Sequence, residues 1–474
     1  MNVWPDVRQW VGPFRAGAMT MTWTEDWWWQ IPEVSPQVYG FLLDALRLAG
    51  SYHGAPAQFY VMPFHGCSAD NFRRMNALGL AHGVKILNHF HTESQVLTTW
   101  DYVDVMDSPR MYQAIHDVIR ETGAVEHRLY PAMPKQARIA IMLSRAADTW
   151  DTEDLGGGGH LYSAKFNVNN EERKAIWLAL RHAQYPVDSI TDEDIADGGL
   201  APYKVLYIVG SEMLGAAAGR LKEWVRGGGV VYATGGGGLL DEYHRPITGL
   251  YEMYGIAGHK LVRHSRHVRP RQTLRRASAQ DRLAVELVDG ANGPLTLEAY
   301  FYREILEPGG GGKAAGSYRN GEQGVVVNTF GKGRTLYCGA LAGMAYIKSA
   351  LRPPIPTLPE SFSGEVRRFI TTAARWARIV RPVVASEPLV ETQYMSGPNG
   401  DMVLLVNWRD KPVKDLVVSF PDSGDIRSLR SLRKAGYFKG HLHEQQRGAL
   451  AIVRRDGAAA VRMDLRIWDC LLVD

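Results

Sequence analysis

Segments with strand-like and helix-like patterns alternate over the first 130 residues, and this alternation constrains the fold more than any other feature. The predicted strands are apolar runs at 16–24, 57–64 and 84–90, and the predicted helices are 35–50, 68–82 and 109–122. Strands separated by helices of about 15 residues indicate parallel βα units. Three such units cannot close an eight-stranded barrel, which needs about 250 residues.

Two acids and four tryptophans gather where the first predicted strand ends. The acids are Glu25 and Asp26, and the tryptophans are Trp23, Trp27, Trp28 and Trp29. Flat aromatic faces beside a carboxylate suit a sugar ring and its glycosidic bond, and parallel βα units carry their chemistry at the carboxyl ends of strands. The alternative is that the rings fill a core. Because neighbours on a strand face opposite sides, three consecutive tryptophans predict at least one exposed ring.

The adjacent acids cannot act as a catalytic pair, since strand alternation turns Glu25 and Asp26 to opposite faces. One of them can face the interior of a barrel, where flanking rings would desolvate it and raise its pKa as a general acid requires. We expect that residue to be Glu25. The alternative role for either acid is to cap the next loop or to pair with an arginine such as Arg15.

Polar residues at the other strand ends could hydrogen-bond sugar hydroxyls. They are His65, Asn88, His89 and His91, followed by Glu93 as a candidate second carboxylate. His89 and His91 share strand parity, so both could face the same interior. For Glu93 the alternative is a solvated loop residue. No metal site is predicted, because a third ligand at tight spacing is missing.

The middle of the chain has the pattern of an open, doubly wound α/β domain. Its predicted elements are strands at 138–143, 204–209 and 230–233, helices at 171–184, 219–226 and 364–380, and a hairpin over 324–339. A stretch broken by proline and glycine at about 246–320 is predicted to be an insertion. The glycine runs 156–159, 227–229, 235–238 and 309–312 lack the spacing of phosphate or dinucleotide loops, so they are predicted to be turns.

The last part of the chain alternates short strands without long helices. These predicted strands are 402–407, 416–420, 449–453, 459–463 and 468–473, which together favour a small antiparallel β-sandwich. The predicted domains are therefore residues 1–135, 136–383 and 384–474.

Bulk composition excludes several classes of partner. The chain has 474 residues with a formal net charge of only +4, so neither nucleic acid nor a membrane surface is an expected partner. Three cysteines in three separate regions argue against a disulfide framework and favour a reducing compartment. No secretion signal or apolar run of about 18 residues is evident, so a cytoplasmic location is expected. No cofactor is predicted.

The order of these blocks, together with short motifs, resembles the C-terminal part of glycoside hydrolase family 42, the trimeric β-galactosidases. The segment Gly79–Val84 followed by Asn88–His91 is similar to the family's seventh barrel helix and eighth strand, and Asn328–Arg334 is similar to its trimerisation domain. The resemblance implies a partial (β/α)8 barrel, then a flavodoxin-like and amidotransferase-like doubly wound domain that forms a homotrimer, then the β-sandwich. No cysteine lies between residues 68 and 337, so the middle domain has no thiol nucleophile.

The chain departs from the family pattern in two ways. The first five barrel strands are missing, and with them the position of the family's acid/base. Where the family's nucleophile would follow the seventh strand, this chain has Val61-Met62-Pro63-Phe64-His65 and no carboxylate. The resemblance therefore implies a glycosidase-related protein that acts on β-linked sugars, such as β-galactosides, with a partner chain completing the barrel. The alternatives are a fragment, a relative with relocated acids, or a non-catalytic oligomeric carbohydrate-binding or scaffold protein.

Overall fold

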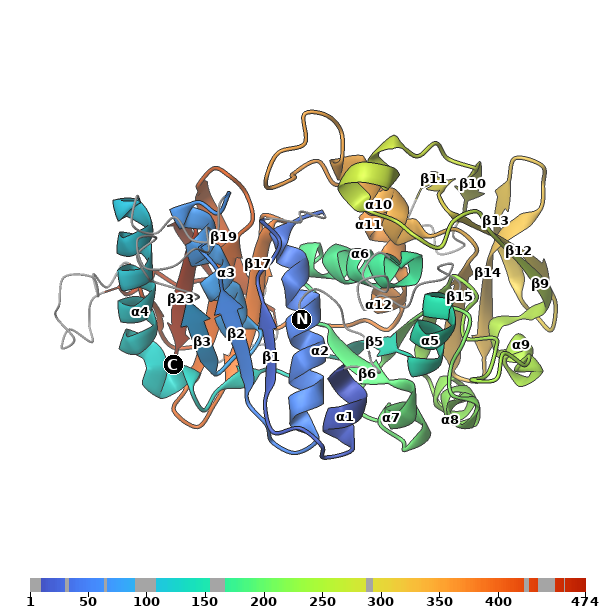
Figure 1. Ribbon diagram of the computed structural model, residues 1–474, viewed down its shortest axis with the longest axis horizontal. Helices are drawn as coiled ribbons and strands as arrows, with labels where there is room; N and C mark the ends of the chain where they lie inside the picture. The colour runs from blue at the N-terminus through green and yellow to red at the C-terminus, as the bar shows by residue number, and fades with distance from the viewer. Residues whose placement is uncertain are drawn as a thin grey trace, which may run out of the picture. The chain divides into compact units, whose positions relative to one another are not determined.

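The chain is a mixed α/β protein with parallel and antiparallel sheets, and its contacts divide it into two compact units (Figure 1). The computed structural model describes residues 10–29, 34–63, 66–89, 108–153, 167–286, 293–421, 426–433, 448–455 and 457–474. Unit 1 comprises residues 14–136 and 380–474, and unit 2 comprises residues 137–379 with the stretch 10–13. Within the described ranges, no helix is long and apolar enough to cross a membrane.

Unit 1 begins with three βα units around a small parallel sheet, drawn in blue in Figure 1. The strands are β1 (Thr22–Glu25), β2 (Ala57–Val61) and β3 (Ile86–His89), in the order β1-β2-β3. The helices are α1 (Gly12–Arg15), α2 (Tyr39–Ser51), α3 (Ala69–Ala81) and α4 (Pro109–Leu129), with a 3-10 turn at Pro36–Val38. Serine side chains cap α3 and α4: Ser68 accepts from Asn71 N–H, and Ser108 accepts from Met111 N–H. These elements confirm the predicted alternation.

The second part of unit 1 consists of two antiparallel sheets that share a core. Its strands are β4 (Met133–Pro134), β16 (Val384–Ala385), β17 (Val390–Ser396), β18 (Asp401–Asn407), β19 (Val413–Phe420), β20 (Leu429–Ser431), β21 (Val453–Arg455), β22 (Ala458–Leu465) and β23 (Trp468–Val473). One sheet has the order β16-β19-β22-β21 and the other β20-β23-β18-β17-β4. Val403 and Leu405 of one sheet and Leu416 and Val418 of the other belong to the same buried cluster.

Buried polar contacts join these two parts of unit 1. The Arg74 guanidinium of α3 donates to the carbonyls of Asn407, at 2.7 Å, and Arg409, at 2.8 Å. His82 lies between Asp44 of α2, at 2.7 Å, and Glu391 of β17, at 3.0 Å. Burial disfavours the charged imidazole, but the two carboxylates outweigh it and raise the pKa of His82.

Unit 2 is built on a nine-stranded sheet with the order β11-β10-β13-β14-β15-β8-β7-β5-β6. Its strands are β5 (Ile139–Leu143), β6 (Asp188–Thr191), β7 (Val205–Val209), β8 (Val230–Thr234), β10 (Asp281–Val285), β11 (Leu295–Ala299), β13 (Lys313–Tyr318), β14 (Gln323–Phe330) and β15 (Gly333–Cys338). Strands β6, β5, β7, β8 and β15 are parallel, and the other four are antiparallel. Every residue of β5, β7 and β8 is buried, which explains their uninterrupted apolar sequences.

The helices of unit 2 follow the predicted order with one break. They are α5 (Arg145–Glu153), α6 (Val168–His182), α7 (Asp192–Ala196), α8 (Gly215–Arg226), α9 (Tyr251–Tyr254), α10 (Ala342–Ala350), α11 (Gly364–Ile370) and α12 (Thr372–Trp376), with a 3-10 turn at Thr248–Leu250 and a π-helical turn at Pro270–Leu274. The single helix expected over 364–380 is therefore two short ones. The stretch at 246–320, predicted to be an insertion, supplies β10, β11 and β13 to the main sheet and also the antiparallel pair β9 (Ile256–Arg263) and β12 (Tyr302–Pro308).

Candidate functional site

The register of the three parallel strands groups several candidate residues on one face. Glu25 is paired with Tyr60, and Tyr60 is paired with Asn88. Trp23 lies two residues before Glu25 on the same face, and its ring meets the Tyr60 ring at 5.8 Å between centroids. We call this set, Trp23, Glu25, Tyr60 and Asn88, the Trp23 face. All four residues are half-buried.

The opposite face of the sheet is covered by helices. Phe59 of β2 is fully buried and contacts Tyr39 of α2. A Cβ atom added at Gly79 of α3 would lie 3.0 Å from Phe59 and 3.1 Å from Leu87, so the helix backbone packs directly on this side. The Trp23 face is therefore the side of the sheet on which these helices do not pack.

Glu25 is the acid of the Trp23 face. The indole N–H of Trp27 donates to its Oε2 at 2.5 Å, which orients the carboxyl. Trp27 itself is half-buried, and its backbone N–H donates to the Tyr39 hydroxyl at 2.8 Å. Glu25 thus combines partial solvent access with one fixed hydrogen bond.

Asp26 occupies a different environment. Its N–H donates to the Tyr60 carbonyl at 3.0 Å, so the ladder continues past β1 and strand alternation turns the Asp26 side chain away from the Trp23 face. The carboxylate is fully buried and accepts the indole N–H of Trp29 at 2.8 Å and the backbone N–H of Trp28 at 3.2 Å. Burial raises the pKa of Asp26 to about 7. Asp26 is therefore the acid of this segment that burial desolvates.

The four tryptophans of this segment divide into two pairs. Trp28 and Trp29 are 3 % and 9 % exposed, and their rings pack edge to face at 4.9 Å. They belong to the core, which is the alternative role given above for these rings. Trp23 and Trp27 are half-buried and keep ring surface for a ligand.

His89 also differs from the sequence-based expectation. It is in register with Val61, and its Nε2 lies 2.9 Å from the Asn76 Oδ1 of α3. The ring contacts Phe72 at 5.0 Å. Burial lowers the pKa of His89 to about 4, so the imidazole is neutral at physiological pH. The His89 side chain therefore packs against α3 on the helix-covered side of the sheet, whereas Asn88 lies on the Trp23 face.

Three of the predicted site residues, His65, His91 and Glu93, lie outside the described residues. Sequence reasoning missed Tyr60, although strand alternation places it on the same face as the residue that ends β1. In the described part of the chain, no group of three or more His, Cys, Asp or Glu side chains could hold a metal ion.

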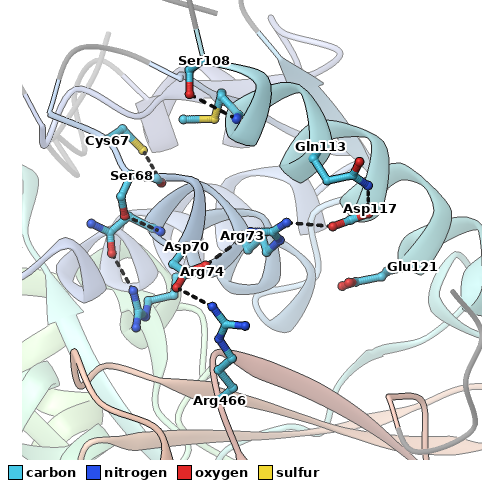
Figure 2. Close-up of polar contacts among 12 residues, drawn as sticks. Cys67, Ser68, Asp70, Arg73, Arg74, Ser108, Gln113, Asp117, Glu121 and Arg466 are labelled. Carbon is cyan, nitrogen blue, oxygen red and sulfur yellow. Dashed lines mark hydrogen bonds and ion pairs between the residues drawn. The ribbon is translucent and has the colours of Figure 1, made fainter.

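A charged cavity of about 690 Å³ lies where α3 and α4 begin (Figure 2). It is lined by Cys67, Ser68, Ala69, Asp70, Arg73, Ser108, Arg110, Met111, Gln113 and Arg466. Arg73 pairs with Asp70 at 3.3 Å and with Asp117 at 2.7 Å, and Arg466 lies 3.5 Å from Asp70. Arg73 and Arg466 are thus paired with carboxylates of the protein itself, which gives these charges a structural role.

The fold is similar to that of solved glycoside hydrolases. The sequence matches no protein-family model and no curated protein sequence. The GH42 beta-galactosidase Gan42B from G. stearothermophilus aligns with a TM-score of 0.65 and 17% identity, over 95% of this chain and 58% of that one. A beta-galactosidase from Bacillus circulans sp. alkalophilus gives a TM-score of 0.67 and 14% identity, over 97% and 61%. The alpha-L-fucosidase isoenzyme 2 from Paenibacillus thiaminolyticus gives 0.64 and 14%, over 97% and 66%.

These similarities extend over nearly the whole chain, but the chain spans less than two thirds of the length of each of these enzymes. At identities of 14–17%, what is shared is the fold. Two of these enzymes are beta-galactosidases and the third is an alpha-L-fucosidase, so the shared fold does not identify a substrate.

Proposed function

We propose that the chain is a glycoside hydrolase-related protein of the GH42 type that acts on β-linked sugars as one part of a split enzyme. On this proposal, residues 1–135 are the last βα units of a (β/α)8 barrel. Residues 136–383 are an amidotransferase-like trimerisation domain, and residues 384–474 are a β-sandwich. The similarity to GH42 β-galactosidase structures supports this organisation.

The observation that carries the proposal is the Trp23 face at the carboxyl end of three parallel strands. Trp23 and Tyr60 offer aromatic surface to the apolar side of a sugar ring, and Asn88 and Glu25 offer hydrogen bonds to its hydroxyls. In parallel βα units this end of the strands carries the chemistry. The face is thus suited to a neutral sugar.

Glu25 is the proposed general acid. A sugar held against Trp23 would exclude water from Glu25, whose carboxyl could then transfer a proton to the glycosidic oxygen. A retaining mechanism needs a second carboxyl about 5 Å away. The described end of β2 reads Val61-Met62-Pro63 and has no carboxylate. On this proposal the second carboxyl would come from Glu93, which lies outside the described residues, or from the partner polypeptide that completes the barrel.

The edge of β3 supports the idea of such a partner. In the described residues β3 pairs only with β2, and beside it lies a cavity of about 350 Å³ between β3 and α4. Its lining includes Leu87 and Val118, with Ile119 of α4 and Tyr130 at 59% and 68% exposure. Exposed apolar surface next to an unpaired strand edge is typical of a surface that another chain covers.

Hydrolysis of p-nitrophenyl β-D-galactoside tests the proposal. The chain is assayed alone and after co-expression with an upstream open reading frame that encodes about five βα repeats. We expect Glu25→Gln to lower the rate at least about a hundredfold with an unchanged thermal midpoint, because a general acid contributes 10²- to 10⁴-fold.

Asp26→Asn is the matched control, since its carboxyl is buried away from the Trp23 face. It should lose stability rather than rate. Loss of turnover in Asp26→Asn but not in Glu25→Gln would reverse the assignment. If neither variant changes the rate, the acids come from elsewhere.

A non-catalytic, oligomeric carbohydrate-binding or scaffold protein is the second candidate. It is favoured by the single carboxylate, Glu25, on the described Trp23 face. Binding and hydrolysis measurements distinguish the two candidates. The second is supported if the chain binds galactose, Trp23→Ala abolishes this binding, and no hydrolysis is detected either for the chain alone or after co-expression.

We also propose a homotrimer with unit 2 forming much of the interface, following the resemblance to a trimerisation domain. Light scattering at micromolar concentration should give about three times the chain mass. A measured mass of 52.8 kDa, that of one chain, would exclude it.

A further inference from the structure

Polar side chains gather in unit 2 at the carboxyl ends of β5 and β7. In the order β6-β5-β7-β8-β15, the chain passes from β5 to β6 on one side and then returns to β7 on the other. Such a reversal is a topological switch point, where open α/β sheets bind their ligands. The segment after β5 carries Asp151 on α5, and the segment after β7 is Gly210-Ser211-Glu212.

Six side chains around this switch point contain buried polar atoms without a hydrogen-bond partner. We call them the switch-point cluster: Asp151 (Oδ1), Asn169 (Oδ1), Arg173 (Nε and Nη2), Glu212 (Oε2), Arg263 (Nε) and Tyr302 (OH). The other carboxylate oxygen of Glu212, Oε1, lies 3.2 Å from His244 Nδ1. Five of the six residues are at most 2% exposed. Buried polar groups are normally paired, so a concentration of unpaired ones requires an explanation.

Contacts show that these residues form one group. The amide of Asn169 donates to the Asp151 carboxylate. Arg263 lies 3.9 Å from Glu212 and 5.7 Å from the centre of the Tyr302 ring. Burial and the nearby charge of Asp151 raise the pKa of Glu212 to about 7. The side chains of the cluster therefore interact with one another, although they come from α5, α6, β9, β12 and the loop after β7.

Glycine backbone brings the strand ends close to the cluster. A Cβ atom added at Gly210 would lie 3.6 Å from the Asn169 amide nitrogen and 3.9 Å from Arg173 Nη2. A Cβ atom at Gly236, in the loop after β8, would lie 2.0 Å from Ser211 Oγ. Any larger residue at Gly236 would push the β8 loop off the cluster.

We propose that the switch-point cluster is a binding site for a small neutral polyhydroxylated molecule, such as a monosaccharide or polyol. The cluster offers both fixed acceptors and fixed donors, and a hydroxyl group can satisfy either kind. The carboxylates of Asp151 and Glu212 would repel an inorganic anion. The guanidinium groups of Arg173 and Arg263 would repel a metal cation. One guanidinium is already neutralised, since Arg173 Nη1 pairs with Asp148 at 2.8 Å.

This site lies wholly in unit 2 and does not depend on the function proposed for the Trp23 face. The glycine run 235–238, predicted only as a turn, forms the loop after β8 that packs against Ser211, next to the cluster. All four glycines have positive φ values of 56° to 103°, a conformation that favours glycine.

Calorimetric titration of the full chain with D-galactose, D-glucose and sorbitol tests the inference, using the Glu25→Gln, Trp23→Ala background to silence the Trp23 face. We expect one of the three to bind and Tyr302→Phe to weaken that binding about tenfold. Tyr302→Phe should not lower the thermal midpoint without ligand, because its hydroxyl is unpartnered.

Tyr207→Phe is the matched control: its buried hydroxyl donates to the Ile370 carbonyl at 2.8 Å. It should lower the thermal midpoint and leave the affinity unchanged. Binding of inorganic phosphate or L-glutamine in place of the hydroxylated probes would overturn the proposal. So would failure of all three probes, or a high-resolution structure soaked in them that shows only water at the cluster. If Glu25→Gln leaves galactoside hydrolysis unchanged while binding at the cluster is intact, that result counts against the Trp23 face alone.

Discussion

The Trp23 face and the switch-point cluster occupy the same kind of place, the carboxyl ends of parallel strands, yet their polar groups differ. Glu25 is half-buried and accepts an indole N–H, whereas Glu212 is 1% exposed and lies 3.2 Å from His244 Nδ1 and 3.9 Å from Arg263 Nη2. One sheet has three strands and helix cover on one face, and the other has nine strands with fully buried central ones. The comparison teaches that strand topology indicates where a ligand can bind, and that the layers around the strands decide how solvated the site is.

The largest expected difference concerns glycines at the two strand ends. Gly236 has φ of 103°, and an added Cβ would clash with Ser211, so Gly236→Ala should cost about 3–5 kcal/mol of unfolding free energy. Gly66, after β2, has φ of 87°, but its nearest neighbour would be the Trp29 carbonyl at 3.7 Å. Gly66→Ala should cost about 1–2 kcal/mol. Urea unfolding measures both, and equal losses would show that the two strand ends are packed alike.

The buried acids at the two strand ends should respond differently to neutral replacement. Asp26 accepts two N–H groups, so the amide nitrogen introduced by Asp26→Asn would face a donor, and this substitution should cost about 2 kcal/mol. Glu212→Gln should cost less, about 1 kcal/mol, because the one close contact it alters is that of Oε1 with His244 Nδ1, at 3.2 Å. A larger loss for Glu212→Gln than for Asp26→Asn would contradict the assignment of partners.

The same pair predicts a pH dependence. Asp26 has a pKa raised from 3.8 to about 7, and Glu212 from 4.5 to about 7, so the folded chain holds protons that the unfolded chain has released. Their contribution to stability is therefore greatest below about pH 4 and falls as pH rises to about 7. Each variant should flatten this slope in unfolding measurements between these two values. An unchanged slope in both would show that other groups control it.

The smallest expected effect is on Glu25. Because the amide oxygen introduced by Glu25→Gln can still accept the Trp27 indole N–H at a half-buried position, this substitution should change the unfolding free energy by less than about 0.5 kcal/mol. Thermal unfolding at pH 7 checks this. A loss above about 2 kcal/mol would mean that Glu25 is as deeply embedded as Asp26.

Much of the fold followed from local sequence patterns. Spacing located the strands and helices of the three βα units, and the apolar runs at β5, β7 and β8 were evident because those strands are buried on both faces. The strands between 256 and 318 were missed, since glycine and proline interrupt their pattern. Alternation along the strand correctly placed the Glu25 and Asp26 side chains on opposite faces of the sheet, but it could not predict which face the helices would cover. That side determines which carboxyl is desolvated.

The switch-point cluster was beyond sequence reasoning for a different reason. Its members lie between residues 151 and 302, and each one is ordinary among its chain neighbours. Only the folded sheet brings Asp151 of α5 near Glu212 and Tyr302. A local window cannot register such an arrangement, because neither period nor motif links the residues.

Unit 1 is assembled from two stretches of chain that flank unit 2, and this has a consequence for synthesis on the ribosome. Strand β4 and the buried His82 must wait for β17, their partner strand, until residues 137–379 have been translated. At about 5–20 residues per second, that interval is on the order of tens of seconds. During it the nascent βα units have only their own contacts. Unit 2, which is continuous apart from residues 10–13, can fold first.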